Sequence, residues 1–572
     1  MRKKFVQIAA VCLLAGVALA LGPGASPTAD AASQGEETIR VGLYYGSSAM
    51  DGANLANEVG EGFRFGYFDE DEQFVSLAYS EDTSISIVKT TNVYYGTSGG
   101  YTSYHESNTG SDIVVGCYHI QLPGEYTTFE NALVAASVYD GGFVAYIDGT
   151  YYARVGNFTD RAGAEAAQEE LAAQGVTAAI RGTSAYGISV VDTGTNTILF
   201  QYDDSDNSAL FGVAPNAAGE TGEKFETWFR GYTKYGTFRY ERVNGGDLTI
   251  VNILGLEDYV KGVVPYEMSD SWPIEALKAQ AVCARTYALA NLNRHSSYGF
   301  DICSSTHCQA YYGTNRAGSN SDSAVDQTAG LVATYNGRLA ECYYYSSNGG
   351  TSEDVSVVWG SDQSRYPYLV GVVDPYEALV VDQISNYEWS YEYTGEELAA
   401  ELSQMEYTWA TDIVAVTVTE YSRMGNPAYI QFTDASGLVT PDISTGALVR
   451  NLGLRSYHYT ITGGGSSGGQ LMVNGQPVDG LDGLYAIGGD GNISAIGGGA
   501  YVIDGNGDIV QAGSGGGSSS SDGVFTISGA GWGHNVGMSQ WGAYAQAQEG
   551  RTYLQILTFY YTGITVERFE NI

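Results

Sequence analysis

The sequence is poor in basic residues, in cysteines and in long apolar runs. Its 26 lysines and arginines stand against 65 aspartates and glutamates, which gives a formal net charge of −39. Binding to phosphate backbones depends on clustered Lys and Arg side chains, so this balance argues against nucleic acid as a partner. A neutral sugar polymer remains compatible with it.

Cysteine is too rare and too scattered for a disulfide scaffold. One of the six cysteines lies in the first apolar run, and an odd number is left without it. Ordinary hydrophobic cores must then stabilise the fold. The other five are Cys117, Cys283, Cys303, Cys308 and Cys342.

The single long apolar run lies near the start of the chain, over residues 8–21. Basic residues precede it, and Ala29-Asp30-Ala31 offers a small-x-small cleavage pattern. Residues 1–31 are therefore predicted to be a signal peptide. An uncleaved anchor is the alternative, but the run is shorter than the roughly 20 residues that span a bilayer. We expect a secreted protein with no membrane span after signal removal.

A chain of 572 residues exceeds what one hydrophobic core organises, so a multi-domain protein is expected. Residues 38–45 and 84–95 alternate apolar and polar side chains, which predicts a β-rich region over residues 38–140. Residues 463–521 combine Gly/Ser-rich linkers with a Gly- and Asp-rich insert that is predicted to form a β-hairpin excursion. Because helical patterns occur elsewhere, the predicted fold class is α+β.

Residues 145–185 follow a strand, helix, strand pattern. Residues 151–158, a helix over 162–174 and the helix stop at Gly175 carry the pattern. The segment resembles a SPOR-type repeat, a small module that binds glycan strands stripped of their peptides. The alternative is a general α+β packing unit without a ligand.

Residues 248–292 contain the most informative motif. A strand over 248–254 is followed by the segment 263–268, and Pro273 then opens a helix. Glu267 is thus expected at a strand-to-helix junction among apolar neighbours. Partial desolvation there would raise the pKa of its carboxyl group and suit it to general acid catalysis. From the residues alone, the alternative is a helix-start carboxylate stabilised by backbone amides.

This block resembles the SpoIID/LytB family. The family pattern is Gly-Val-Val-x-x-Glu-Met followed by Pro-x-Glu-Ala-Leu-Lys-Ala-Gln-Ala-Val-x-Ala-Arg-Thr-Tyr, and residues 262–287 fill every position. The resemblance assigns residues 220–462 and 522–572 to the two parts of a SpoIID catalytic domain. It implies that Glu267 is the acid/base of a peptidoglycan lytic transglycosylase. Arg285, on the motif helix, is a candidate for substrate binding.

Residues 301–311 resemble the Cys/His segment of the family, which holds zinc in some members. Cys303, His307 and Cys308 can supply three ligands of a tetrahedral zinc site. A small-loop disulfide between the two cysteines is the competing interpretation for an exported protein. No fourth ligand is evident, and zinc is expected to be structural because acid/base chemistry needs no metal. Gln309 is a further candidate for substrate binding.

Residues 342–351 resemble a family segment that usually reads His-Ser-Thr-x-Gly-Gly. Tyr345 stands where the family has the His, which puts any role of that His in doubt here. Ser346 and Ser347 are candidates for hydrogen bonds to sugar. The alternative is a polar turn before the two glycines.

Residues 531–543 resemble the Gly-His-Gly-x-Gly-Met-Ser-Gln-Tyr-Gly-Ala signature, with Asn535 and Trp541 in place of Gly and Tyr. His534 and Gln540 are candidates for lining the substrate cleft. For His534 the alternative is a satisfied core histidine in a Gly-rich turn.

The resemblance implies peptidoglycan glycan strands, preferably already stripped of their stem peptides, as the substrate, and 1,6-anhydro-N-acetylmuramic acid ends as the product. It also implies a cell-wall amidase as a partner and a role in cell-wall remodelling or sporulation. A transglycosylase manages with one carboxyl group because the C6 hydroxyl of its substrate is the nucleophile, whereas a hydrolase generally needs two. One alternative is a non-catalytic, peptidoglycan-binding enhancer of an N-acetylmuramoyl-L-alanine amidase. A zinc hydrolase built on the Cys/His segment ranks last.

Overall fold

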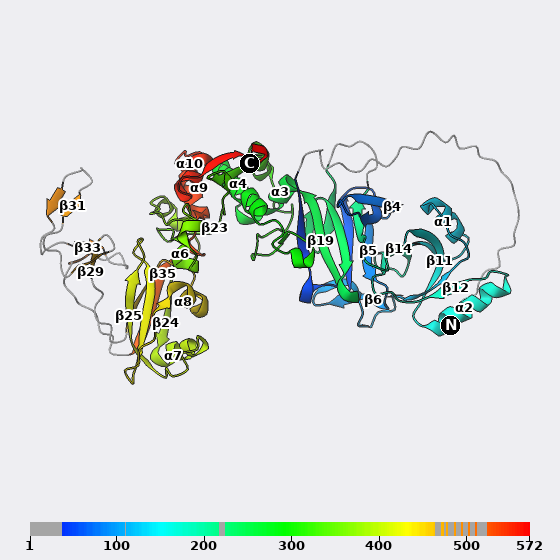
Figure 1. The fold of residues 1–572 in the computed structure, drawn as a ribbon, viewed down its shortest axis with the longest axis horizontal. Coiled ribbons are helices and arrows are strands. Elements are labelled where there is room, and N and C mark those ends of the chain that lie inside the picture. Colours follow the sequence, from blue (N-terminus) through cyan, green and yellow to red (C-terminus); the bar gives the residue numbers. More distant parts are fainter. Residues whose placement is uncertain are drawn as a thin grey trace.

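A β-rich body, a group of helices and a second lobe follow one another in the computed structural model of the chain (Figure 1). It describes residues 37–463 and 523–571, except 109 and 217–223, and six short strands between 471 and 511. The predicted signal peptide lies outside the described residues. No helix in the described part of the chain is long and apolar enough to cross a membrane. Helices and several sheets coexist, so the predicted α+β, multi-domain class is confirmed.

Two large sheets form the body, and side chains from both share one hydrophobic core. The seven-stranded sheet contains, from edge to edge, β20 (Ile302–Cys303), β1 (Thr38–Tyr44), β19 (Leu248–Gly255), β18 (Thr237–Arg242), β15 (Leu210–Pro215), β3 (Phe63–Phe68) and β4 (Phe74–Ser80). The ten-stranded sheet contains β12 (Ala179–Arg181), β9 (Tyr118–Gln121), β11 (Thr150–Phe158), β10 (Gly142–Ile147), β14 (Ile198–Asp203), β13 (Ile188–Asp192), β5 (Ser84–Lys89), β2 (Gly52–Val59), β16 (Glu226–Phe229) and β17 (Tyr232–Lys234). A small sheet of β6 (Val93–Ser98), β7 (Tyr101–His105) and β8 (Val114–Val115) lies beside them.

Strand β1 joins the start of the chain to the motif block. It pairs antiparallel with β19, with Thr38 opposite Gly255. Ile39 and Val41 on β1 are fully buried and belong to the same hydrophobic core as the helices that follow β19. The predicted N-terminal region and the beginning of the predicted catalytic domain therefore share one sheet.

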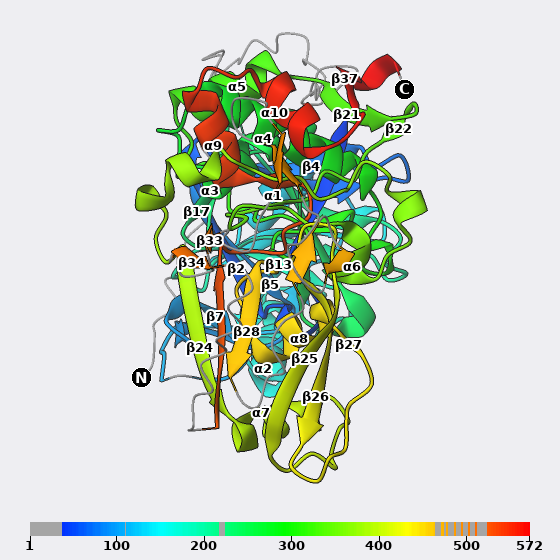
Figure 2. The ribbon, with the colours of Figure 1, turned by 90° about the vertical axis from the view of Figure 1, so that its left-hand side faces the viewer.

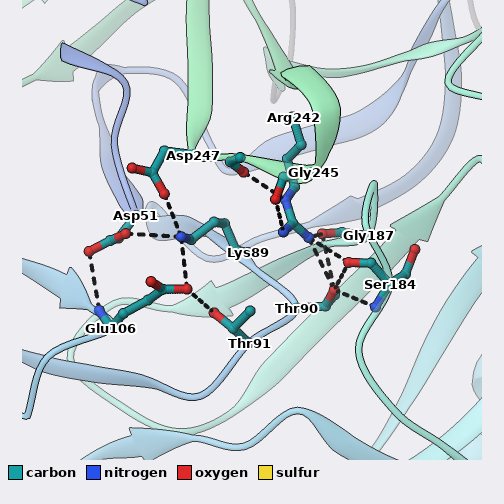
Figure 3. Close-up of polar contacts among 11 residues, drawn as sticks. Asp51, Lys89, Thr90, Thr91, Glu106, Ser184, Gly187, Arg242, Gly245 and Asp247 are labelled. Atoms are coloured by element: carbon teal, nitrogen blue, oxygen red, sulfur yellow. Dashed lines mark hydrogen bonds and ion pairs between the residues drawn. The ribbon is translucent and has the colours of Figure 1, made fainter. Parts of the chain in front are cut away.

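A buried lysine ties three further segments of the body together (Figure 3). Lys89 ends β5 and is almost fully buried, and its Nζ lies 3.0 Å from Asp51 and 2.9 Å from Glu106. Asp247, the residue before β19, is its third partner. Burial by itself lowers the pKa of Lys89, but hydrogen bonds to the three carboxylates outweigh it and raise that pKa overall. The ammonium group is thus held ionised between distant parts of the chain.

The SPOR-like segment is the second half of a larger unit in the ten-stranded sheet. The unit runs through β9, α1 (Phe129–Ala136), β10, β11, α2 (Arg161–Ala173) and β12. Its strands lie in the order β12-β9-β11-β10, and each neighbouring pair is antiparallel. This is the arrangement of a βαββαβ unit, in which each half contributes one helix.

The helices gather between the β-rich body and the second lobe (Figure 1). They are α3 (Leu256–Glu267), α4 (Ile274–Ala290), α5 (Ser319–Gln327), α6 (Val355–Trp359), α9 (Gln540–Gln548) and α10 (Tyr553–Tyr560). Short strands β21 (Leu331–Tyr335), β22 (Arg338–Leu339) and β37 (Thr565–Arg568) form one sheet there, and β23 (Tyr344–Tyr345) pairs with β36 (Met538–Ser539). Most residues of α4 are buried all around its axis, which is typical of a central core helix.

The second lobe is a small α+β unit, seen at the far end from α5 and α10 in Figure 2. It contains β24 (Glu388–Thr394), α7 (Gly395–Gln404), β25 (Ile413–Tyr421), β26 (Pro427–Asp434), β27 (Ile443–Ser444), α8 (Thr445–Leu452), β28 (Tyr459–Gly463) and β35 (Val524–Ala530). Strand β35 lies between β24 and β28, so the chain returns to this lobe after residues 464–523.

Most of the predicted insert and its linkers, residues 463–521, lies outside the described residues. The strands described there pair as three short antiparallel hairpins. They are β29 (Leu471–Val473) with β30 (Gln476–Val478), β31 (Tyr485–Ile487) with β32 (Ile493–Ala495), and β33 (Tyr501–Ile503) with β34 (Ile509–Gln511).

Candidate active site

Glu267 is the last residue of helix α3, whereas the sequence predicted a strand-to-helix junction. The helix begins directly after β19, because Gly255 provides an extended N-cap and Glu257 and Asp258 fill the first turn, where the helix dipole favours carboxylates. Pro265 stays inside the helix, which ends at Glu267. The carboxyl group of Glu267 therefore lies at the negative end of the helix dipole, which disfavours its ionised form.

Gln540, the first residue of helix α9, holds the carboxyl group of Glu267. Its Nε2 donates a hydrogen bond to Glu267 Oε2 at 3.0 Å. Ser539 caps the helix by accepting a hydrogen bond from the backbone N–H of Gly542, and this fixes the position of Gln540. Two motifs that are far apart in the sequence thus meet in one contact.

A chain of hydrogen bonds reaches Glu267 from a second direction. The hydroxyl group of Tyr259 donates to Gln309 Oε1 at 2.8 Å, and Gln309 Nε2 donates to the hydroxyl oxygen of Tyr344 at 3.1 Å. Tyr344 in turn hydrogen-bonds to Glu267. Because the hydroxyl oxygen of Tyr344 already accepts from Gln309, its proton is directed toward Glu267. The nearly buried Gln309 thus orients Tyr344.

Burial raises the pKa of Glu267 above its ordinary value. Hydrogen bonds from Gln540, from the backbone N–H of Ala310 and from Tyr344 lower it only in part. These donors are neutral, and no lysine or arginine of the described chain forms an ion pair with Glu267. A carboxyl group in this setting keeps its proton to a higher pH, as a general acid requires.

Glu267 lies in an open cleft of about 590 Å³. The cleft is lined by α3, α4, the loop 306–310, β23, the end of α6 and the segment 532–534. Of the described residues that line it, Glu267 is the only one with a carboxyl group. The predicted site residues that the cleft brings together are Glu267, His307, Cys308, Gln309, Ser346, His534 and Gln540.

Arg285 and Ser347 do not line this cleft. The fully buried guanidinium group of Arg285 pairs with Glu257 and donates to the carbonyl oxygen of Leu331 at 3.0 Å. The sequence made Arg285, on the motif helix, a candidate for substrate binding, but in the structure its guanidinium group contacts α3 and β21 instead. Ser347 is fully buried, and its backbone exchanges hydrogen bonds with that of Trp532. The two residues thus position the walls of the cleft.

His534 forms a neutral part of the cleft wall. Burial lowers the pKa of its imidazole to about 4, so the ring is uncharged at neutral pH. Nδ1 accepts a hydrogen bond from the backbone N–H of Val536 at 3.2 Å, which places the ring proton on Nε2. The rings of Tyr345 and Trp359 each lie 5.2 Å from the imidazole, measured between centroids. Tyr345, the departure from the family pattern, therefore packs on His534.

Glu377, which the sequence did not single out, joins two walls of the cleft. Its buried carboxyl group accepts hydrogen bonds from the backbone N–H groups of Asn348 and Gly349 at 2.9 Å and from the hydroxyl group of Ser539 at 2.6 Å. Burial raises the pKa of Glu377 to about 7. It thereby links the loop that follows Ser346 to the start of helix α9. An isolated Glu at the start of a short 3-10 helix, Glu377–Leu379, offered no sequence signal for this role.

Cys303, His307 and Cys308 meet His295, a fourth residue that the sequence analysis missed. The ligand atoms of the four side chains all lie within 4.8 Å of one another. His295 Nε2 lies 3.3 Å from Cys308 Sγ, and His307 Nδ1 lies 3.7 Å from each cysteine sulfur. Both cysteines are free thiols, so the alternative disulfide is not formed. His295 precedes the Cys/His segment in the chain, and the spacing of that segment therefore did not reveal it.

The four side chains fit a tetrahedral zinc ion. Zinc bonds of about 2.0–2.3 Å to nitrogen and sulfur set tetrahedral ligands about 3.3–3.8 Å apart. The 3.3 and 3.7 Å separations fall within this range. Two thiolates and two imidazoles form a closed, structural ligand set with no open position for substrate.

Comparisons with known proteins agree with these motifs. Residues 244–335 match the family model SpoIID, described as stage II sporulation protein. An uncharacterized protein of Brachyspira hyodysenteriae is 29% identical over 368 residues, which are 63% of this chain and 81% of that protein. The amidase enhancer of Bacillus subtilis is 31% identical over 315 residues, 54% of this chain and 40% of the enhancer. Stage II sporulation protein D of the same organism is 31% identical over 142 residues, 22% of this chain and 40% of that protein.

The region matched by the family model contains part of the candidate site. The family model extends over the whole of α3 and α4 and over the Cys/His segment, and so includes Glu267 and the four candidate zinc ligands. The chain spans about 40% of the length of each Bacillus subtilis relative. Residues 244–335 therefore form a SpoIID family domain, and the chain around them is similar to the amidase enhancer and to stage II sporulation protein D.

Proposed function

We propose that this protein remodels the bacterial cell wall as a peptidoglycan lytic transglycosylase, with Glu267 as its acid and base. The observation that carries the proposal is a single carboxyl group in an open cleft, with a raised pKa and with neutral hydrogen-bond donors around it. Hydrolytic glycosidases generally need a second carboxyl group to activate water or to form a glycosyl intermediate. A cleft with one suits a reaction in which the substrate supplies the nucleophile.

In the proposed reaction, Glu267 first donates a proton and then takes one up. The protonated carboxyl group donates its proton to the oxygen that bridges N-acetylmuramic acid and the next sugar, and the bond between that oxygen and C1 breaks. The C6 hydroxyl oxygen of the same N-acetylmuramic acid forms a bond to C1, while the Glu267 carboxylate takes the hydroxyl proton. One fragment ends in a free hydroxyl group and the other in a 1,6-anhydro ring. Proximity of the C6 hydroxyl replaces a bound water molecule.

Gln540 and Tyr344 support both halves of this cycle. Burial favours the neutral acid before the first transfer. After that transfer, the donors already in place on the two side chains stabilise the carboxylate. An ion pair at this position would hold Glu267 ionised and remove the acid, so the neutral character of the donors is part of the proposal.

We further propose that His295, Cys303, His307 and Cys308 bind one structural zinc ion, on the strength of their separations and donor types. Zinc would fix the loop that carries Gln309 and Ala310, and none of the proton transfers passes through it. Metal analysis of the purified protein should find about one zinc per chain. Cys308→Ser should lose the metal and melt at a lower temperature, whereas Cys117→Ser, at a buried thiol in the body, should retain it. A folded wild-type protein that takes up no zinc would contradict the assignment.

The proposed setting is the cell wall outside the membrane. The predicted signal peptide would export the chain, and a cell-wall amidase that removes stem peptides is the proposed partner. The βαββαβ unit, in which the SPOR-like segment lies, would provide a second contact with peptide-free glycan.

The relative named amidase enhancer favours a second candidate function, in which the protein binds peptidoglycan without cutting it and stimulates an amidase. The two functions separate on whether the purified protein alone releases fragments from peptide-free glycan strands.

The test compares the wild type with Glu267→Gln and with Glu549→Gln, an exposed carboxylate near the end of the helix that begins at Gln540. The transglycosylase proposal predicts anhydro-ended fragments from the wild type and from Glu549→Gln, and at least about a thousandfold lower rate from Glu267→Gln. Fragments from Glu267→Gln at the wild-type rate would refute the assignment of that residue. Binding without cleavage, together with faster peptide release by an added amidase, would establish the enhancer function instead.

A further inference from the structure

Strand β1 supports the segment that carries Cys303. It pairs in parallel with β20, so that Gly42 lies opposite Cys303. The backbone N–H of Asp301 donates to the carbonyl oxygen of Arg40 at 3.0 Å, and that of Ser304 donates to the carbonyl oxygen of Gly42 at 3.1 Å. Backbone hydrogen bonds on either side of this candidate zinc ligand therefore tie it to a strand that lies far away in the sequence.

An ion pair from the same strand fixes the loop before Cys303. The guanidinium group of Arg40 donates to both carboxylate oxygens of the buried Asp301, from Nε at 3.1 Å and from Nη2 at 2.7 Å. Asp301 also accepts a hydrogen bond from the backbone N–H of Asn293, and its carbonyl oxygen accepts one from the backbone N–H of His295, each at 3.1 Å. Because a paired fork of this kind is strong and directional, Arg40 fixes the backbone that presents His295.

Tyr45, the residue after β1, packs against two of the candidate zinc ligands. Its hydroxyl group hydrogen-bonds to the Cys303 side chain. Its ring lies 5.8 Å from the imidazole of His295 and 4.8 Å from the ring of Phe300, measured between centroids. Phe300 in turn stacks on His295 at 5.1 Å, and it lies so close to Gly42 that a Cβ atom there would be 2.3 Å from its ring. The segment from Gly42 to Tyr45 therefore holds both ligands in place.

Side chains that contact metal ligands orient them, and the loss of one such contact typically weakens metal binding about 10- to 100-fold. We propose that Tyr45 and Arg40 are positioning residues for zinc, and that strand β1 is a required part of the metal site. The Tyr45 hydroxyl group donates to the Cys303 sulfur and directs it toward the other ligands. Arg40 acts through its carboxylate partner on the loop that carries His295. This inference rests on the zinc site proposed above and extends it to a strand outside residues 244–335, which the family model matches.

The same contacts reach the cleft, because the segment that carries Cys303 continues to a residue that contacts Glu267. The backbone N–H of Tyr311 donates to the carbonyl oxygen of Ser304 at 3.1 Å, which closes the loop between them. The backbone N–H of Ala310 in this loop hydrogen-bonds to Glu267. Since Ser304 is also bonded to β1, the strand is connected to the proposed acid through the loop of the candidate ligands.

The test measures the zinc affinity of the full-length protein by competition with a chromophoric chelator. Tyr45→Phe keeps the ring and removes only the hydroxyl group, and we expect it to bind zinc at least about tenfold more weakly than the wild type. Its control is Tyr44→Phe, because the Tyr44 ring packs on Phe229 and Arg230 instead. That variant should bind zinc like the wild type.

Arg40 is tested in the same assay, with a control on its second ion pair. Arg40→Gln should weaken zinc binding by a similar factor. Glu72→Gln removes the exposed partner of Arg40 and leaves the pair with Asp301, so its zinc affinity should equal that of the wild type. Equal zinc affinities of Tyr45→Phe, Arg40→Gln and the wild type would overturn the inference.

A spectroscopic measurement separates positioning from a general loss of stability. Cobalt(II) can replace zinc at a tetrahedral thiolate site, where its absorption includes a sulfur-to-metal charge-transfer band. Removal of a hydrogen bond from the Cys303 sulfur should move this band to longer wavelength in Tyr45→Phe, while the melting temperature of the metal-free protein stays near that of the wild type. A lower melting temperature of the metal-free variant, with an unchanged band, would show that Tyr45 acts on stability alone and would overturn its role.

These outcomes are distinct from those of the proposed reaction. A wild type that binds no zinc would refute the metal site together with this inference, whereas anhydro ends would still support the reaction at Glu267. Weaker zinc binding by Tyr45→Phe, in a protein that never produces anhydro ends, would keep the inference and refute the transglycosylase.

Discussion

Lys89 and Glu267 show two opposite ways of burying an ionisable group. In the β-rich body, the Lys89 ammonium lies among three carboxylates that hold it ionised. In the cleft, Glu267 has no ion-pair partner among the described residues and is bound by neutral donors. The partners shift the pKa of Lys89 toward the charged form, whereas burial shifts that of Glu267 toward the neutral form.

The difference indicates that Lys89 has a structural role, whereas Glu267 is suited to proton transfer. A compensated charge gives up no proton near neutral pH, and it links segments that are far apart in the sequence, as Asp51 and Asp247 are linked through Lys89 (Figure 3). A buried carboxyl group without a cationic partner is less stable in its ionised form. Such a group can therefore exchange a proton with a substrate near neutral pH. Changing the partners should convert one kind of site into the other.

The largest effect is expected when a cation is placed beside Glu267. In Gln540→Lys, the new ammonium group should lower the pKa of Glu267, so that the protonated fraction at neutral pH falls about tenfold or more. Fragment release should fall by a similar factor. Gln540→Leu removes the donor without adding charge and should move the alkaline limb of the pH–rate profile to higher pH. If both variants kept the wild-type pH profile, the donors around Glu267 would not set its pKa.

The reverse change in the body should affect stability. Lys89→Met leaves three carboxylates without their cation and should destabilise the body by about 3 kcal/mol, measured by urea unfolding. Lys224→Met, which removes an exposed partner of Asp258, should change stability by less than about 1 kcal/mol. Equal effects of the two substitutions would show that the buried cluster is no more important than a surface ion pair.

The smallest effect is expected at Glu377. Its pKa is about 7 in the folded protein and about 4.5 ordinarily, so the folded state binds more protons between these values. The stability contributed by this group is therefore lost as pH rises from about 4.5 to 7, and it is level above that. Glu377→Gln should flatten the fall in melting temperature between pH 5 and 7, whereas Glu388→Gln, at an exposed position, should leave it unchanged. An unaltered slope in Glu377→Gln would show that this carboxyl group does not titrate there.

The motifs that resemble the SpoIID/LytB family named candidate residues of the cleft but not the residues that support them. Glu267 and Gln540 were both candidates, and the structure brings the two into contact. His295 and Glu377 lie outside every motif, because tertiary contacts alone bring them to the site. Arg285 was a candidate for substrate binding in the sequence, but its ion pair with Glu257 allows the guanidinium group to be buried.

Secondary structure was predictable where one pattern dominated, and less so where two competed. The alternating residues of β1 indicated a strand. They did not indicate that its partner would be β19, which is about 200 residues later in the sequence. Helix α3 was not predicted from the sequence. A proline usually breaks a helix, whereas Pro265 lies in the final turn of this one.

The measurement that tests the central claim most directly is mass spectrometry of peptide-free glycan strands cleaved in water enriched in oxygen-18. If the C6 hydroxyl group of the substrate is the nucleophile and Glu267 moves the protons, the new ends will be 1,6-anhydro rings without the heavy isotope. Reducing ends that carry oxygen-18 would show that water attacks C1, and would contradict a reaction run by one carboxyl group.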